Sequence, residues 1–311
     1  MTAFLLLAAV LCWLALPFLP AIHEALRPHD DGALPISERY QEDLRLATLD
    51  ADDVPPQLPD GRSDADPARD LPLIVRHAYI GAVGQSADEI RVSGMARLRA
   101  GTTVRRRLQV GGSVEVDPGS VLRGSAEAGT HFWLGSDVTF ERVHAPTIEV
   151  GVGSATLPDA IPAPFDFPVP DDADLRAGRA LVRGDLMVPP GARLDVTLVV
   201  TGTLALGPGA HVTGDVKAHG DVTLGHGAAV GGNLFAGNDL TLGDRATVTG
   251  AAVAEGVLTI GASACIGQPT ALTTATAREI QVASGARIHG TLWAETTGRT
   301  LSMTAAADAV A

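Results

Sequence analysis

The stretch DVKAHGDVTLGHGAAVGG, residues 215–232, decides the fold, because it is one copy of an 18-residue unit that recurs five times without a gap from Arg179 to Gln268. At positions 2, 4, 8, 10, 14 and 16 of the unit, every copy carries Ala, Val, Leu or Ile, and position 14 is always Ala. A fixed period of this size is typical of a solenoid, in which each copy forms one turn and stacks on the next.

Each unit divides into three hexads, and each hexad holds two aliphatic residues spaced two apart. Alternation with a period of two indicates strands rather than helices. Glycine stands at positions 6 and 11 in four of the five copies, and it suits the corners between strands because it reaches positive φ without a steric cost. We therefore predict an all-β fold, a single-stranded parallel β-helix whose triangular coils of 18 residues stack about 4.8 Å apart.

The inward aliphatic residues are predicted to form the core. A single coil cannot bury its own apolar side chains, so each coil depends on its neighbours. Burial of one Val or Leu side chain contributes roughly 1.5–3 kcal/mol. The central core residues are Val216, Ala218, Val222, Leu224, Ala228, Val230, Leu234, Leu240, Leu242 and Val248.

One outward position is unexpectedly apolar. Position 3 holds Leu181, Val199, Lys217, Phe235 and Val253 in the five copies. Either another part of the chain covers this face, for which Phe165 and Phe167 are the candidates, or the face makes a lateral contact with a partner or a second protomer.

The rest of the β-helix is predicted from weaker copies of the same unit. Residues 71–156 form the N-terminal coils, 157–178 a proline-rich loop, 179–299 the regular coils and 300–311 a flexible tail. Proline cannot donate to a strand ladder, so the loop should leave the solenoid. Because the phase resumes at Arg179, we expect one continuous solenoid of roughly nine or ten coils. The last copy holds four extra residues, which should bulge near residues 273–276.

The N-terminus is a separate part of the chain. Within residues 1–27, Ala3–Ile22 is a run of twenty uncharged residues, long enough to cross a bilayer as an uncleaved anchor. A cleaved signal peptide is the alternative, although no Lys or Arg precedes the run. Residues 28–70 hold twelve acids against four arginines, which predicts a disordered tether. Arg27 and Arg39 follow the apolar run, which favours a β-helix on the cytoplasmic side of the inner membrane, with the periplasmic side as the alternative.

A group of arginines distinguishes the first coils. It comprises Arg97, Arg99, Arg105, Arg106 and Arg107. These residues either form a solvated face, bind anionic lipid headgroups, or hold the acidic tether.

Composition narrows the classes of function. The net charge of −13 argues against nucleic acid as a partner, and aromatic residues make up only 4% of the chain. The sequence has no Walker loop, no G-x-S-x-G elbow and no C-x-x-C pair, and Cys12 and Cys265 are not expected to pair. His211, His219 and His226 fall at different positions of the coil. We therefore predict no catalytic residues, no cofactor and no metal site.

The segment GDVKAHGDVTLG (214–225), followed by VGGNLFA (230–236), resembles the bactofilin family, whose members repeat G-D-V-x-A with V-x-I-x-x-G between copies. The match is clear over residues 179–294 and weaker over 89–150. The resemblance implies a right-handed β-helix that polymerises end to end without nucleotide, as a bacterial cytoskeletal scaffold for cell-envelope or cell-shape machinery. This chain departs from the family pattern by its anchor, its acidic tether and its extra coils, which puts free filament assembly in doubt.

Self-association also follows from the repeat itself, because the end coils of a solenoid expose unpaired strand edges unless they are capped. No polar cap follows Trp293 in the sequence.

Two other classes of function are the alternatives. A hexapeptide-repeat acyltransferase also uses coils of this length, but it needs a catalytic histidine and has one inward aliphatic residue per hexad. An extracytoplasmic β-helix that binds glycan, or serves as an envelope module, requires the opposite membrane topology.

Overall fold

The computed structural model describes residues 73–75, 78–80, 86–151, 163–168, 173–176 and 178–301, all within one compact unit that spans residues 58–311. Every regular element in these ranges is a strand, so the all-β prediction is confirmed. None of these residues belongs to a helix that could cross a membrane. The predicted anchor (1–27), the tether (28–70) and residues 302–311 of the predicted tail lie outside the described residues.

The first nine strands form a stack of coils that we call the N block. Successive coils pair in parallel, and partners such as Val114 and Phe132 are 18 residues apart. The strands are β1 (Leu73–Val75), β2 (Ala78–Ile80), β3 (Ser86–Val92), β4 (Ala96–Leu98), β5 (Thr103–Val110), β6 (Val114–Val116), β7 (Val121–Ala128), β8 (His131–Leu134) and β9 (Thr139–Val150).

The strands after the proline-rich segment form a second stack, the C block. Three rows of parallel strands run along it, with partners such as Val222 and Leu240 again 18 residues apart. The strands are β12 (Arg179–Val182), β13 (Leu186–Val188), β14 (Ala192–Leu194), β15 (Thr197–Val200), β16 (Leu204–Leu206), β17 (His211–Val212), β18 (Val216–Ala218), β19 (Val222–Leu224), β20 (Ala229–Val230), β21 (Leu234–Ala236), β22 (Leu240–Leu242), β23 (Thr247–Val248), β24 (Ala252–Ala254), β25 (Val257–Ile260), β26 (Cys265–Ile266), β27 (Thr273–Val282) and β28 (Arg287–Thr300).

The core lies inside the coils, as predicted. All ten core residues named from the sequence are at most 2% exposed. The alanine column at position 14 is fully buried from Ala192 to Ala264. Together the two blocks make about eleven turns, more than the nine or ten coils expected from the sequence. The insertion in the last copy lies slightly earlier than expected, where Gln268 and Ala271 form an isolated bridge before β27.

The corners use glycine differently from the prediction. At position 6 only Gly184 has a positive φ, of 82°. Positive φ recurs instead at position 13, in Gly191, Gly209, Gly227, Arg245 and Ser263. Glycine at position 11 is required by close approach of the preceding coil, since a Cβ on Gly225 would lie 2.7 Å from the backbone N of Pro208.

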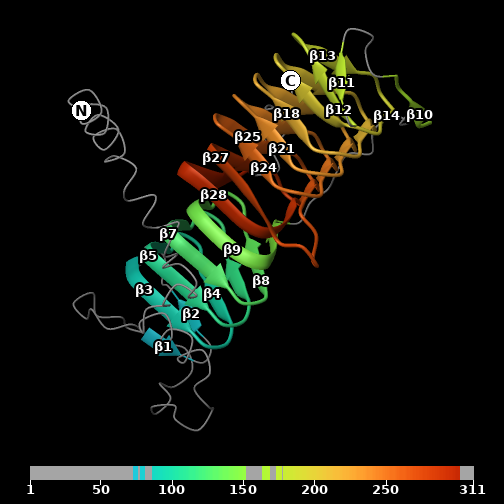
Figure 1. Ribbon diagram of the computed structural model, residues 1–311. Coiled ribbons are helices and arrows are strands. Elements are labelled where there is room, and N and C mark those ends of the chain that lie inside the picture. The colour runs from blue at the N-terminus through green and yellow to red at the C-terminus, as the bar shows by residue number, and fades with distance from the viewer. Residues whose placement is uncertain are drawn as a thin grey trace, which may run out of the picture. The chain divides into compact units, whose positions relative to one another are not determined.

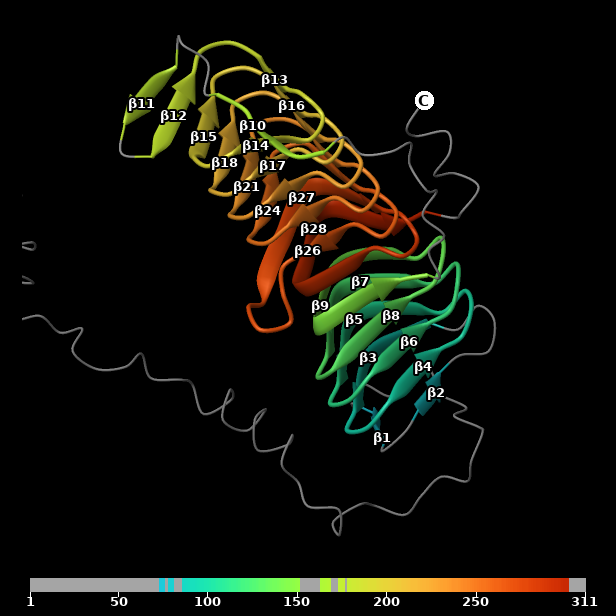
Figure 2. The ribbon, with the colours of Figure 1, turned by 90° about the vertical axis from the view of Figure 1, so that its right-hand side faces the viewer.

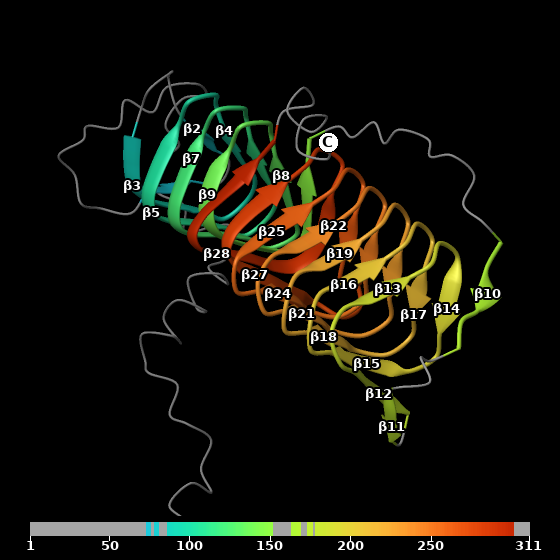
Figure 3. The ribbon, with the colours of Figure 1, turned by 90° about the horizontal axis from the view of Figure 1, so that it is seen from above.

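The expectation of one continuous solenoid is wrong, because the C block runs back toward the N block. Its last strand, β28, pairs antiparallel with β9, the last strand of the N block. Figures 1 and 2 show β9 in green beside β28 in red, with the first coil of the C block at the far end. The two stacks therefore meet through their C-terminal coils, and the first coil of each block faces outward (Figure 3).

Candidate functional site

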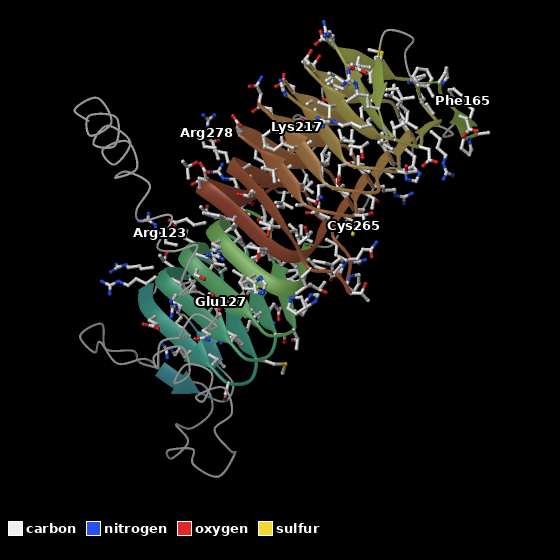
Figure 4. All side chains as sticks on the ribbon, viewed as in Figure 1. Arg123, Glu127, Phe165, Lys217, Cys265 and Arg278 are labelled. Carbon is white, nitrogen blue, oxygen red and sulfur yellow. The ribbon has the colours of Figure 1, made fainter. Side chains whose placement is uncertain are left out.

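The outer end of the C block is partly covered by the proline-rich segment. Strand β10 (Phe165–Asp166) pairs with the outer side of β14, and β11 (Asp174–Arg176) pairs antiparallel with β12. Phe167 packs against the core, and Figure 4 shows Phe165 at this end of the block. The prediction that these two phenylalanines cover the position-3 row is therefore wrong, because they extend β14, which lies on another side of the coil.

Strand β13 remains open at the same end. Its N–H at Leu186 donates to Thr203 O and its carbonyl at Val188 accepts from Gly207 N, so both residues bond to the next coil. Alternate residues of a parallel strand bond to opposite sides, so the backbone N–H and C=O of Met187 face outward. Among the described residues no strand pairs with β13 on that side. The Met187 side chain is 78% exposed, and Leu175 and Phe165 of the neighbouring strands are exposed as well.

The outer end of the N block also carries strand edges. Strand β1 pairs with β3 and β2 pairs with β4. In the part of the chain that the structure describes, neither strand has a partner on its outer side. The free ends of the unit are thus the first coils of the two blocks, whereas the coil that holds Trp293, predicted to be an uncapped end, is paired with β9.

The position-3 residues belong to a longer line of side chains on one face of the coils, which we call the basic–aromatic row; within it Val199 is buried, at 7% exposure. Strand register extends it across the junction, in the order Leu181, Val199, Lys217, Phe235, Val253, Thr276, Trp293, Arg142, Ser125 and Arg107. Two cation–π contacts lie in the row. Lys217 Nζ is 5.1 Å from the Phe235 ring centroid, and Arg142 Cζ is 5.6 Å from that of Trp293.

The structure divides the five arginines named from the sequence. Arg97 forms ion pairs with Glu115 and Asp117, at 3.4 and 3.1 Å. Arg99 lies just after the same strand, β4. The other three, Arg105, Arg106 and Arg107, are exposed on β5. The structure therefore joins Arg107 to the apolar position-3 residues rather than to Arg97.

Two further arginines of this surface were not identified from the sequence. Arg123 is exposed on β7 and could have been found from the period, because it lies 18 residues after Arg105. Arg142 contacts Trp293 only because β9 meets β28, and no repeat arithmetic reveals that pairing. In Figure 4, Arg123 and Arg278 point outward along the same edge of the unit.

The junction between the blocks is held by polar contacts as well as by the ladder. Thr300 is fully buried; its hydroxyl donates to Gly135 O at 2.7 Å and accepts from Val138 N at 2.8 Å. His144 Nδ1 lies 2.8 Å from Thr291 Oγ1. Arg287 Nε donates to Glu149 at 2.9 Å.

Acidic and amide side chains at the corners tie successive coils together. Asp185, Asp215 and Asp239 each accept the backbone N–H of the residue 18 positions later, at 2.7 Å. The bond from Thr203 N–H lowers the pKa of Asp185. These carboxylates therefore have a structural role.

The described residues contain no group of three His, Cys, Asp or Glu side chains that could hold a metal ion. Cys265 is half-buried, and this burial raises the pKa of its thiol. Comparison of the chain with protein-family models, with curated proteins and with solved structures gives no match. The candidate functional features are the outer strand edges and the outward rows of the solenoid.

Proposed function

We propose that this protein is a non-enzymatic scaffold that associates with itself end to end, without nucleotide, while Ala3–Ile22 anchors it in the inner membrane. The right-handed winding that the bactofilin resemblance implies is part of this proposal. Unknown envelope proteins are the expected further partners, and the β-helix is expected on the cytoplasmic side.

The observation that carries the proposal is the open edge of β13. An exposed strand edge is a template for another chain unless charge, proline or a cap protects it. Here the outward backbone groups of Met187 have no strand partner among the described residues, and the outermost strands of this end carry three exposed apolar side chains, Phe165, Leu175 and Met187. Such an edge favours the addition of a strand from a second copy.

The junction provides a precedent inside the chain for contact between coil ends. There β9 and β28 pair antiparallel along three successive stretches, and Ile288 and Leu292 are fully buried. The same strand chemistry is available at the outer ends. Because the C-terminal coils are already joined, assembly is expected to use the first coil of each block, with the proline-rich segment limiting the contact at the C-block end.

The test is sedimentation velocity and negative-stain electron microscopy of the full chain in detergent without nucleotide. We expect concentration-dependent oligomers or filaments. Met187→Arg should shift the protein toward the monomer, whereas Thr223→Arg, in the same column two coils inward, should not. A monomer at every concentration, or equal effects of the two variants, would refute end-to-end assembly through this end.

Membrane topology is tested separately by a phosphatase fused to the C-terminus. We expect no phosphatase activity, because the enzyme would stay in the cytoplasm. Activity would place the β-helix in the periplasm and favour the envelope-module alternative.

A further inference from the structure

We propose that the basic–aromatic row docks the solenoid sideways on an anionic lipid bilayer. The sequence presents its apolar part and its arginine part as separate features. The strand register places both on one line that crosses ten strands.

The row is distinguished by its charge. From Leu181 to Arg107 it contains three basic residues and no acid, in a chain whose net charge is −13. Acids stand only beyond its two ends, where Asp174 pairs with Leu181 and Glu89 with Arg107. Arg105, Arg106 and Arg123 are exposed on the same strands as its basic end, β5 and β7.

Another side of the N block shows the contrast. Trp133 faces outward on β8, but its partners in register are Glu115 and Glu149. Trp293 is 47% exposed and lies beside Arg142. Because Glu115 pairs with Arg97 and Glu149 with Arg287, the row of Trp133 balances its charges. The row of Trp293 holds basic residues and no acid, so it suits an anionic partner better.

The chemistry of the row fits a lipid surface better than a peptide. Tryptophan is enriched at the level of lipid headgroups, and arginine and lysine near the surface are attracted to anionic lipids. Except at the buried Val199, the row is partly or fully exposed. At the strand spacing it is on the order of 40 Å long, so it matches an extended planar partner. Exposed acids in adjacent rows, Glu127, Glu255 and Glu295, restrict the contact to the row itself.

This proposal rests on the membrane anchor of the proposed function, but it is independent of self-association. The anchor brings the row to the bilayer, so the contact with lipid can be weak. If the full chain does not float with vesicles, the proposed membrane anchor is wrong. If it floats but Trp293 does not meet lipid, only the docking proposal fails.

The test uses the full chain in phosphatidylcholine–phosphatidylglycerol vesicles that carry brominated acyl chains, which quench nearby tryptophan. Trp13→Phe with Trp133→Phe leaves Trp293 as the only tryptophan, and Trp13→Phe with Trp293→Phe leaves Trp133 as the matched control. We expect Trp293 to be quenched at least about twofold more than Trp133, and more than in phosphatidylcholine vesicles, because the attraction is electrostatic.

Charge reversal distinguishes an effect of the basic residues in the row from an effect of the net charge of the protein. Arg107→Glu with Lys217→Glu should abolish quenching of Trp293. Arg193→Glu with Arg299→Glu makes the same change in net charge at exposed positions outside the row, and it should leave quenching unchanged. Circular dichroism checks that each variant is folded.

Three results would overturn the proposal: no quenching of Trp293 in anionic vesicles, equal quenching of Trp133, or equal effects of the two charge reversals. An acidic protein as the true occupant would give the first of these.

Discussion

Replacing Leu224 by Asp should unfold the C block. Leu224 is fully buried and lies in register between Leu206 and Leu242, so the new carboxylate has no polar partner. Loss of the leucine removes about 2–3 kcal/mol, and desolvation of the unpaired carboxylate adds several more, or about 5–8 kcal/mol in total. That sum is comparable to the whole stability of a typical domain, about 5–15 kcal/mol.

The matched control is Thr223→Asp, at the adjacent residue on the outward side. We expect Leu224→Asp to lose much of the β-sheet circular dichroism signal, and Thr223→Asp to unfold within a few degrees of the parent protein. A soluble Leu224→Asp protein with an unchanged spectrum and melting temperature would refute the dry core. Equal damage from both variants would refute the assignment of inward and outward positions.

Three further predictions concern corners and contacts. Gly225→Ala should cost about 1–3 kcal/mol by chemical denaturation, because overpacking is destabilising and the new Cβ would lie 2.7 Å from Pro208 N; an unchanged stability would contradict this. The pKa of Asp185 is lowered in the folded protein. Its hydrogen bond therefore stabilises the fold above about pH 4, and this contribution to the free energy of unfolding is lost as the pH falls further. Asp185→Asn should flatten that acid dependence in pH-dependent unfolding, and an unchanged acid slope would argue against the bond. At the junction, Thr300→Val should cost about 1–3 kcal/mol by leaving buried backbone groups unpaired, whereas Arg287→Ala, at an exposed ion pair, should cost at most about 1 kcal/mol; the reverse order in urea unfolding would contradict this picture.

The core could be predicted because its cause is local. An aliphatic pair in every hexad fixes which side chains point inward, and the 18-residue period fixes which residues stack, as Val222 does on Leu240. The corners were predicted less well. The left-handed residue stands at position 13, where Arg245 and Ser263 replace glycine in two copies, so the sequence column is less regular than the backbone it encodes.

The direction of the C block could not be predicted from the repeat, because the phase of the coils is the same whether the second block continues the first or returns to it. The meeting of the two blocks becomes visible only in the structure. The last coils of the two blocks form unusually long strands, Thr139–Val150 and Arg287–Thr300. The row that joins Trp293 to Arg142 depends on this reversal, so it could not be predicted from the sequence either.

The most direct test of the account is disulfide formation across the junction in the full chain, with Cys12 and Cys265 replaced by Ser. His144 and Thr291 are opposite each other in the antiparallel ladder, so His144→Cys with Thr291→Cys places two thiols at a Cα separation of about 4.5–5.5 Å, within disulfide reach. We predict rapid cross-linking of this pair. The pair His144→Cys with Leu181→Cys should not cross-link, because Leu181 lies on β12, which would stack on β9 only if the solenoid were continuous. Cross-linking of the second pair without the first would contradict the back-to-back arrangement on which the outer ends and the row depend.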